Sequence, residues 1–361
     1  MPPVTSNHSD LSHIGWHEQP WPSDLPDGGF VARVIAQHRV GYQVHDGKDT
    51  HTAHPAPRFL KASVDPVDRP AVGDFVVVVP GQSLLIDRIL PRRTQLIRAA
   101  AGERHRRQVI ATNIDAVLVI TGLDGDFNPA RIERYLLVVA GSGATPVVIL
   151  TKADNLDEQS LADAIEVIQA RVPSNVPVLA VNGKSSESVA QLLPWLGAGD
   201  SAVLVGSSGA GKSTITNTLL GEQRQSTNTV RNNDSRGRHT TTHRALIQLP
   251  SGACLIDTPG MREIKLTGEE RIDMGQFADI DQLAMQCRFS DCAHLSEPGC
   301  AVRAAVENGQ LDEEHLHSFL KLRDELAIAS ESAEAQLRRK GEVKLLTRAL
   351  GKRLIEKYDE R

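Results

Sequence analysis

One short stretch limits what this chain can fold into. Residues 206–214 read Gly-Ser-Ser-Gly-Ala-Gly-Lys-Ser-Thr and fit the phosphate-binding pattern G-x-x-x-x-G-K-[S/T], the P-loop. Ala202 to Val205 precedes it and predicts a buried strand, and Ile215 to Leu220 follows it and predicts a helix. A strand, a glycine-rich turn and a helix N-terminus together surround a phosphate group with backbone N–H groups. The chain is therefore expected to contain an α/β nucleotide-binding domain.

Strands and helices alternate through the region that leads to this loop. We predict strands at 115–121, 146–150 and 177–181, and helices at 128–140, 156–172 and 185–196. Asn128-Pro129 is typical of a helix start, with Asn as the N-cap and Pro at the first helical position. The alternation predicts a doubly wound, mostly parallel sheet.

The strand at 146–150 runs into Thr151-Lys152-Ala153-Asp154, which resembles the guanine-recognition motif N-K-x-D. The Asp154 carboxylate can accept hydrogen bonds from guanine N1–H and the exocyclic amine, a pattern that adenine lacks. The Lys152 stem can lie along the base. Thr151 stands where Asn is usual, so one side-chain donor that braces the P-loop is expected to be missing.

Two further segments follow the P-loop. Residues 237–242 contain a histidine and three threonines and predict either switch I or an ordinary surface turn. Asp257-Thr258-Pro259-Gly260 has the D-x-P-G form of switch II, in which Asp257 holds magnesium through water and the Gly260 N–H meets the γ-phosphate. The guanine motif therefore precedes the P-loop in the chain. This order is a circular permutation of the usual order of GTPase motifs.

Three cysteines and a histidine lie close together in the last third of the chain, in the pattern Cys287-x4-Cys292-x-His294-x5-Cys300. Three thiolates and one imidazole predict a closed, tetrahedral, structural zinc site, and free buried cysteines are the alternative. Helices are predicted beside it at 301–308 and 312–329.

The N-terminal region has a different character. Residues 1–28 are rich in proline, lack apolar periodicity and predict a disordered tail. Residues 29–95 contain short strand-like runs at 30–35, 40–44, 74–79 and 84–90, and predict either an OB-type barrel or a small barrel that serves as a spacer. Residues 87–107 carry seven arginines and two carboxylates, which predict either a solvated face or phosphate contact.

Composition excludes several classes of protein. The net charge is −5, so nucleic-acid contact must come from local patches. We find no apolar run near the ~20 residues of a membrane span and no signal peptide, which predicts a cytoplasmic protein.

Residues 331–361 predict a basic helix that either docks on the surface or contacts RNA.

The barrel, the permuted order and the C-x4-C-x-H-x5-C site resemble the RsgA family of GTPases over residues 29–330. The resemblance implies a multidomain α/β protein with an OB-fold barrel at 29–95, a permuted GTPase domain at 96–265 and a helical zinc-binding domain at 266–330. It implies a monomeric, cytoplasmic GTP hydrolase that binds the small ribosomal subunit and its rRNA and assists late maturation. Hydrolysis would be stimulated by the subunit, and nucleotide state would control residence there.

The resemblance also assigns residues. Met261 replaces the glutamine that orients water in other GTPases, so His239 is the catalytic candidate together with Lys212, and a mobile exposed histidine is the alternative. The implied magnesium ligands are Ser213, Thr241 and Asp257. The implied zinc ligands are Cys287, Cys292, His294 and Cys300. The implied GTP-binding residues are Thr151, Lys152, Ala153, Asp154, Gly206, Ser207, Ser208, Gly209, Ala210, Gly211, Lys212, Ser213, Thr214, Asp257 and Gly260.

Three other functions stay open at this point. The chain could be a GTP-gated RNA-binding checkpoint in which hydrolysis only times release. It could also be an ATPase, or a GTPase that acts on another RNA or on a protein.

Overall fold

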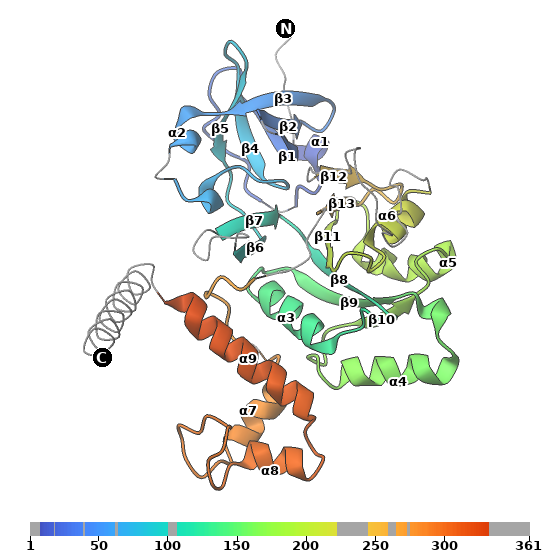
Figure 1. Ribbon diagram of the computed structural model, residues 1–361. Coiled ribbons are helices and arrows are strands. Elements are labelled where there is room, and N and C mark those ends of the chain that lie inside the picture. Colours follow the sequence, from blue (N-terminus) through green and yellow to red (C-terminus); the bar gives the residue numbers. More distant parts are fainter. Residues whose placement is uncertain are drawn as a thin grey trace, which may run out of the picture.

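The computed structural model describes residues 8–331 apart from 18, 39, 62–63, 100–106, 222–244, 259–264 and 273–274. Figure 1 shows a β-barrel at the top, a sheet with flanking helices in the middle, and a group of helices below. Within these ranges, none of the helices combines the length and apolar character that a membrane span requires. The basic helix predicted at 331–361 lies almost entirely outside the described residues.

The N-terminal barrel is closed. Its strands follow the order β1-β2-β3-β5-β4, and β4 returns to pair with β1. Alternate apolar side chains such as Phe30, Val44 and Ile86 fill its interior. The predicted OB-type barrel is therefore confirmed. Its strands and short helices are β1 (Phe30–His38), β2 (Gly41–His45), β3 (Thr50–Pro55), α2 (Pro57–Leu60), η1 (Pro66–Asp68), β4 (Phe75–Val79) and β5 (Leu84–Ile89).

Strand β3 is the barrel element that sequence pattern did not predict. Its sequence is Thr-His-Thr-Ala-His-Pro, and of these side chains only that of Ala53 is fully buried. Ala53 pairs with Tyr42 of β2 and with Leu84 of β5. Backbone pairing with two neighbours therefore holds β3 in place without an apolar alternation.

The prediction of a disordered tail at 1–28 differs from the structure over its described part. Helix α1 (His8–Ser12) and the turn after it bury Leu11, Ile14 and Trp16. The Trp16 ring lies 4.8 Å from the Phe75 ring of the barrel, centroid to centroid. The same cluster includes Cys254 of the central sheet, so this segment fills the junction between the barrel and the sheet. Three apolar side chains are enough to anchor this segment, and they are too few to produce a visible apolar periodicity in the sequence.

Arg33 of β1 strengthens this junction. Its side chain is fully buried, and its guanidinium donates to Ser201 Oγ at 2.8 Å and to the carbonyl oxygens of Asn113, Gly73 and Ile14. These acceptors belong to the N-terminal segment, the barrel and the central sheet. A buried guanidinium with most of its donors satisfied therefore ties three parts of the chain together.

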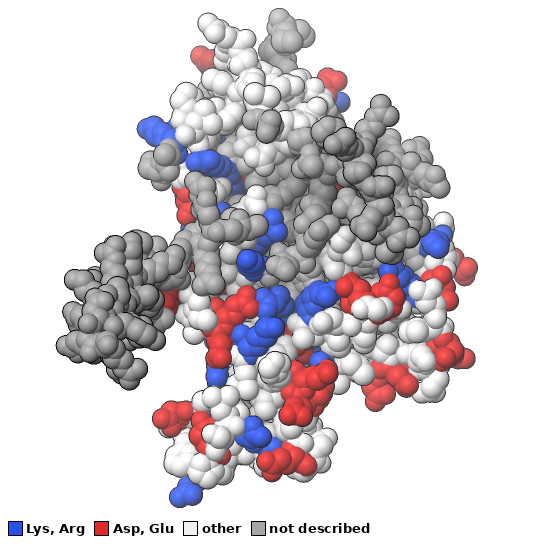
Figure 2. All heavy atoms as spheres, viewed as in Figure 1, with Lys and Arg blue, Asp and Glu red and all other residues white. Residues whose placement is uncertain are grey.

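The predicted basic linker forms a hairpin, β6 (Gln95–Ala99) and β7 (Arg107–Thr112). Two of its arginines form ion pairs with carboxylates: Arg92 with Asp74 at 2.7 Å and Arg93 with Asp115 at 2.6 Å. Figure 2 shows Lys and Arg side chains gathered in the middle of this face, with Asp and Glu beside them. Part of the positive charge is thus neutralised within the protein.

The central sheet has the order β10-β9-β8-β11-β13-β12, in which only β12 is antiparallel to its neighbour. One face packs against α3 and α4, and the other against α5, η3 and α6. This is the predicted doubly wound sheet, and β12 also meets β1 of the barrel through the pair Ala36 and Ala245. The strands are β8 (Ala116–Gly122), β9 (Thr145–Thr151), β10 (Val178–Val181), β11 (Ser201–Gly206), β12 (Ala245–Gln248) and β13 (Cys254–Asp257). The helices are α3 (Pro129–Ala140), η2 (Ala153–Asn155), α4 (Glu158–Gln169), α5 (Ser186–Val189), η3 (Ala190–Trp195) and α6 (Lys212–Leu220).

The C-terminal helices are α7 (Ala278–Ala284), α8 (Ala301–Glu307) and α9 (Glu313–Ser330), close to the predicted spans for the last two. Figure 1 shows α9 lying between α3 above it and α7 and α8 below it. Two hydrogen bonds of 2.7 Å join the Arg134 guanidinium of α3 to the Glu325 carboxylate of α9. The helical region is thus docked directly on the central domain.

Candidate nucleotide and metal sites

The P-loop lies at the edge of the sheet where parallel strands end together. It follows β11, which ends at Gly206, and leads into α6, which begins at Lys212. Gly206 pairs with Ile120 of β8, and Gly122 at the end of β8 pairs with Thr151 of β9. Since ligands of open α/β sheets bind outside the carboxyl ends of the strands, the P-loop and residues 151–154 border one site.

Glycine is required at two positions of the P-loop. A Cβ on Gly206 would lie 2.2 Å from the carbonyl oxygen of Ile120. Gly211 has a φ of 97°, and a Cβ there would lie 3.1 Å from Thr151 Oγ1. The loop backbone therefore approaches β8 and Thr151 too closely for larger residues.

Thr151 braces the P-loop, contrary to the expected loss of a donor. Its side chain is 1% exposed, and its Oγ1 lies 2.5 Å from the carbonyl oxygen of Ala210. A threonine hydroxyl carries one proton where an asparagine amide carries two, yet that proton is directed to the P-loop. The close approach of Gly211 is what brings this short side chain within reach.

Lys212 is half-buried at the start of α6. Its ammonium donates to the carbonyl oxygens of Gly206 at 2.7 Å and Ser207 at 2.5 Å. Burial lowers the pKa of Lys212 to about 8, although the nearby carboxylates of Asp257 and Asp126 favour the charged form. A polyanion bound at the loop would add further opposite charge beside this ammonium.

Switch II begins at the same edge. Asp257 is the last residue of β13, and the Thr258 hydroxyl donates to the Leu204 carbonyl at 2.9 Å, which fixes the start of the segment on β11. Gly260 and Met261 lie outside the described residues, as do the switch I candidates His239 and Thr241.

The predicted base-recognition loop, residues 151–154, adopts a compact turn. Lys152 has a φ of 62°, and Asp154 lies exposed in η2. The next loop along the sheet edge, at 182–184, is fastened to the P-loop helix because Thr218 Oγ1 donates to the Gly183 carbonyl at 2.7 Å. The loops that would flank a base and its phosphates thus belong to one connected structure.

Two carboxylates of the site were missed by sequence reasoning. Asp124 pairs with Lys152, and Asp126 accepts a hydrogen bond from the P-loop Ser207. Both lie in the loop after β8. The rule that sites form at the carboxyl ends of parallel strands could have found them, because β8 is a strand of the same sheet.

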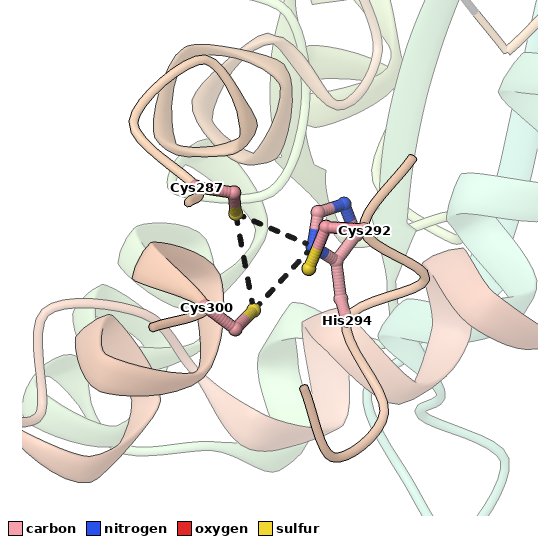
Figure 3. A group of neighbouring side chains, drawn as sticks. All are labelled: Cys287, Cys292, His294 and Cys300. Carbon is pink, nitrogen blue, oxygen red and sulfur yellow. Dashed lines mark hydrogen bonds between the residues drawn. The ribbon is translucent and has the colours of Figure 1, made fainter. Parts of the chain in front are cut away.

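The predicted zinc ligands converge. Figure 3 shows Cys287, Cys292, His294 and Cys300 facing one centre, and their ligand atoms all lie within 4.8 Å of one another. Cys287 Sγ is 3.9 Å from Cys300 Sγ, and His294 Nδ1 is 3.5 Å from Cys300 Sγ. A tetrahedron with metal–sulfur bonds of about 2.3 Å has sulfur–sulfur edges of about 3.8 Å. The group is therefore of a size and chemistry that can hold one metal ion.

The backbone around this cluster is held by side chains of its own region. The Glu297 carboxylate accepts hydrogen bonds from the N–H groups of Ala293, Leu295 and Ser296. Hydrogen bonds from backbone N–H groups, its own and that of Ala293 first, lower the pKa of Glu297 to about 2. Arg323 of α9 donates to the Ala293 carbonyl at 3.0 Å. These hydrogen bonds hold the backbone of the loop that carries His294.

Comparison with known proteins places the chain in a family. The family model of the RsgA GTPase matches residues 89–267. "Small ribosomal subunit biogenesis GTPase RsgA" of Xanthomonas campestris pv. campestris (strain B100) is 54% identical over 343 residues, 92% of each chain. The protein of the same name from Xanthomonas axonopodis pv. citri (strain 306) is 53% identical over 345 residues, again 92% of each.

Solved structures share the fold. YjeQ from Thermotoga maritima superposes with a TM-score of 0.59 at 24% identity, over 83% of this chain and 99% of that one. YloQ, described as a circularly permuted GTPase, gives 0.56 at 23% identity, over 84% and 97%. The permuted fold predicted from motif order is therefore confirmed, and the extended identity to the Xanthomonas proteins shows that this chain belongs to the RsgA family of GTPases.

Proposed function

We propose that this chain hydrolyses GTP and assists the late maturation of the small ribosomal subunit. The observation that carries the proposal is the meeting of the P-loop and the Thr151–Asp154 segment at one sheet edge, joined by the Thr151–Ala210 hydrogen bond. The names of its relatives, small ribosomal subunit biogenesis GTPases, support the second half.

The described residues supply the groups that GTP binding needs. The N–H groups of residues 206–214 would surround the β-phosphate, with Lys212 directed to the β- and γ-phosphates. The exposed Asp154 carboxylate would pair with guanine N1–H and the exocyclic amine, and the Lys152 stem would lie along the ring.

Hydrolysis would be an in-line attack by water on the γ-phosphorus. The bond from that phosphorus to the β–γ bridging oxygen breaks, and GDP and phosphate leave. Magnesium bound with GTP would offset the charge that develops on the phosphate oxygens. Ser213 would hold it directly and Asp257 would hold it through water, and we assign Thr241 as a third ligand and His239 as the group that orients the attacking water.

The nucleotide proposal is tested by competition and by hydrolysis. Unlabelled GTP should displace labelled GDP, whereas ATP in excess should not, and equal displacement would contradict the role of Asp154. His239→Ala should abolish the hydrolysis that small subunits stimulate while leaving GDP affinity unchanged. Unaltered stimulated hydrolysis would remove His239 from the mechanism.

We propose zinc as the ion of the Cys3His group. Four closing ligands leave no open position for a substrate, so the ion would cross-link the loops at 287–300 and take no part in hydrolysis. Thiolate and imidazole donors favour zinc over magnesium or calcium, which prefer oxygen ligands.

We propose that the barrel contacts rRNA and that GTP keeps the protein, as a monomer in the cytoplasm, on the small subunit. OB-type barrels present a strand face that binds oligonucleotides, which supports the barrel as the contact. Purified small subunits should co-sediment with the protein in a non-hydrolysable GTP analogue and release it in GDP.

Two results would redirect this proposal. Lack of co-sedimentation at low salt would remove the ribosomal partner in favour of another RNA. Release that depends on nucleotide, combined with subunit maturation that proceeds equally well with a variant unable to hydrolyse GTP, would favour a checkpoint whose hydrolysis only times release.

A further inference from the structure

The loop at 123–127, which joins β8 to α3, touches both loops of the nucleotide site. Its Asp124 carboxylate pairs with the Lys152 ammonium of the base-recognition loop. Its Asp126 carboxylate accepts a hydrogen bond from the Ser207 hydroxyl of the P-loop. In both contacts a carboxylate accepts a hydrogen bond, and such charge-assisted hydrogen bonds are stronger than those between neutral groups.

The loop is itself well anchored. The N–H of Asp126 donates to Asp124 Oδ1 at 3.1 Å, so the two carboxylates are held in a fixed relation. Arg131 of α3 donates to the other oxygen of Asp126 at 2.5 Å. At the start of the loop, the N–H of Leu123 donates to the Thr151 carbonyl at 2.8 Å. The loop is therefore tied at its beginning to β9 and at its end to α3.

The Asp124–Lys152 pair lies close to Gly122, the last residue of β8. A Cβ on Gly122 would lie 2.9 Å from Asp124 Oδ1 and 3.2 Å from Lys152 Nζ. The side chain of Ser207 is among the buried polar groups, so water has little access to replace Asp126 as its acceptor. Loss of Asp126 would leave the buried Ser207 hydroxyl without its acceptor, whereas loss of Asp124 would release the partly exposed Lys152 ammonium to solvent.

We propose that Asp124 and Asp126 are positioning residues that set the spacing between the base-recognition loop and the P-loop. Asp124 acts through Lys152, and Asp126 acts through Ser207. Neither carboxylate contacts the nucleotide, and both act before it binds, because a site held in its binding geometry loses less conformational entropy on binding. This inference deepens the proposed function and rests on it.

The test is a pair of double-mutant cycles on nucleotide affinity. Dissociation constants for fluorescent GDP and for a non-hydrolysable GTP analogue are measured for Asp126→Ala, Ser207→Ala and the double variant. Each single change should weaken binding about tenfold, and the double change should weaken it no further, because both remove the same contact. Asp124→Ala, Lys152→Met and their double variant should show the same pattern with losses of about two- to fivefold, because this pair is partly exposed to solvent.

Conservative and remote variants separate positioning from general damage. Asp126→Asn keeps an acceptor for Ser207 and should stay within about threefold of wild type. Asp163→Ala removes an exposed carboxylate on α4 and should leave affinity unchanged. Far-UV circular dichroism should show every variant folded, and kcat at saturating GTP should change less than KM.

Two outcomes would overturn the inference. Losses that multiply in the double variants would mean that each carboxylate acts independently of its partner, which refutes positioning through Ser207 and Lys152. Unchanged affinity in Asp126→Ala and Asp124→Ala would refute it as well. Failure of the wild-type protein to bind guanine nucleotides would instead refute the proposed function together with this inference.

Discussion

His315 carries a charge where α9 meets α3 and α7, and its removal should weaken this junction in a pH-dependent way. Its Nδ1 lies 2.7 Å from Glu133 of α3, and its Nε2 lies 3.2 Å from Asp279 of α7. Arg171, after α4, approaches the same Glu133 oxygen at 4.0 Å. Burial opposes the charge of the ring, but hydrogen bonds and attraction from Asp279 and Glu133 together raise the pKa of His315 to about 9.

The expected magnitude follows from the pKa difference. An unfolded histidine has a pKa of about 6.5, so a folded pKa of about 9 corresponds to roughly 3.5 kcal/mol, at about 1.4 kcal/mol for each pH unit of difference. The Asp279 side chain is 46% exposed, so solvent screens its attraction to the His315 ring. We therefore expect the charged His315 ring to contribute about 1–3 kcal/mol to the free energy of unfolding. Because the folded pKa is raised, this stabilisation is complete below about pH 6.5 and is lost as the pH rises through 9.

The assay is urea unfolding of wild type and His315→Gln between pH 6 and 9.5, with zinc held constant. The difference in unfolding free energy should shrink by about 1–3 kcal/mol across this range as the wild-type ring loses its proton. His317→Gln, at an exposed position on the same helix, is the control for a histidine replacement that leaves the junction intact. A constant difference for His315→Gln would refute the charged junction.

Three further changes test the sites. Thr151→Val removes the buried donor to Ala210 with little change in side-chain volume and should weaken GDP binding about tenfold, whereas Thr151→Ser should not. Titration with fluorescent GDP measures both affinities. Equal affinities for the two variants would contradict the role of the Thr151 hydroxyl in holding the P-loop. Asp154→Asn should weaken GTP binding by at least about tenfold and strengthen the binding of xanthosine triphosphate, whose C2 carbonyl can accept a hydrogen bond from the new amide. Competition binding measures both affinities. Equal losses for the two nucleotides would exclude direct contact between residue 154 and the base. Cys300→Ser should reduce bound zinc well below one ion per chain by elemental analysis, and a variant that keeps its full complement would show that Cys300 is not a ligand.

The P-loop, the parallel strands and the Cys3His cluster were predictable because each depends on residue types at fixed spacing. Gly206 and Gly211 are needed where the backbone passes close to β8 and Thr151. The N-cap of α3 is equally local, since Asn128 Oδ1 accepts from the Arg131 N–H at 2.9 Å. Such features are encoded within a few residues and can be seen in a single sequence.

Features that depend on distant partners were not predictable. Strand β3 exists because β2 and β5 offer it backbone partners, and the segment at 8–28 is ordered by a hydrophobic junction built from the barrel and the sheet. Asp124 and Asp126 read as solvated loop carboxylates until the sheet order brings Lys152 and Ser207 beside them. Likewise, the charge of the 87–107 segment could not show that Arg92 has a buried partner.

The place of β11 in the sheet has a consequence for synthesis. β8, β9 and β10 are made first and can pair with one another, but β11 must then enter beside β8, where β13 joins it later. Roughly 80 residues separate the end of β8 from the start of β11, so at about 5–20 residues per second the β8 edge stays unpaired for about 4–16 s. An apolar, unpaired edge is a template for pairing with other chains. The nascent chain is therefore most prone to aggregate after its guanine-recognition half emerges and before its phosphate-binding half does, an interval in which chaperones would have the most effect.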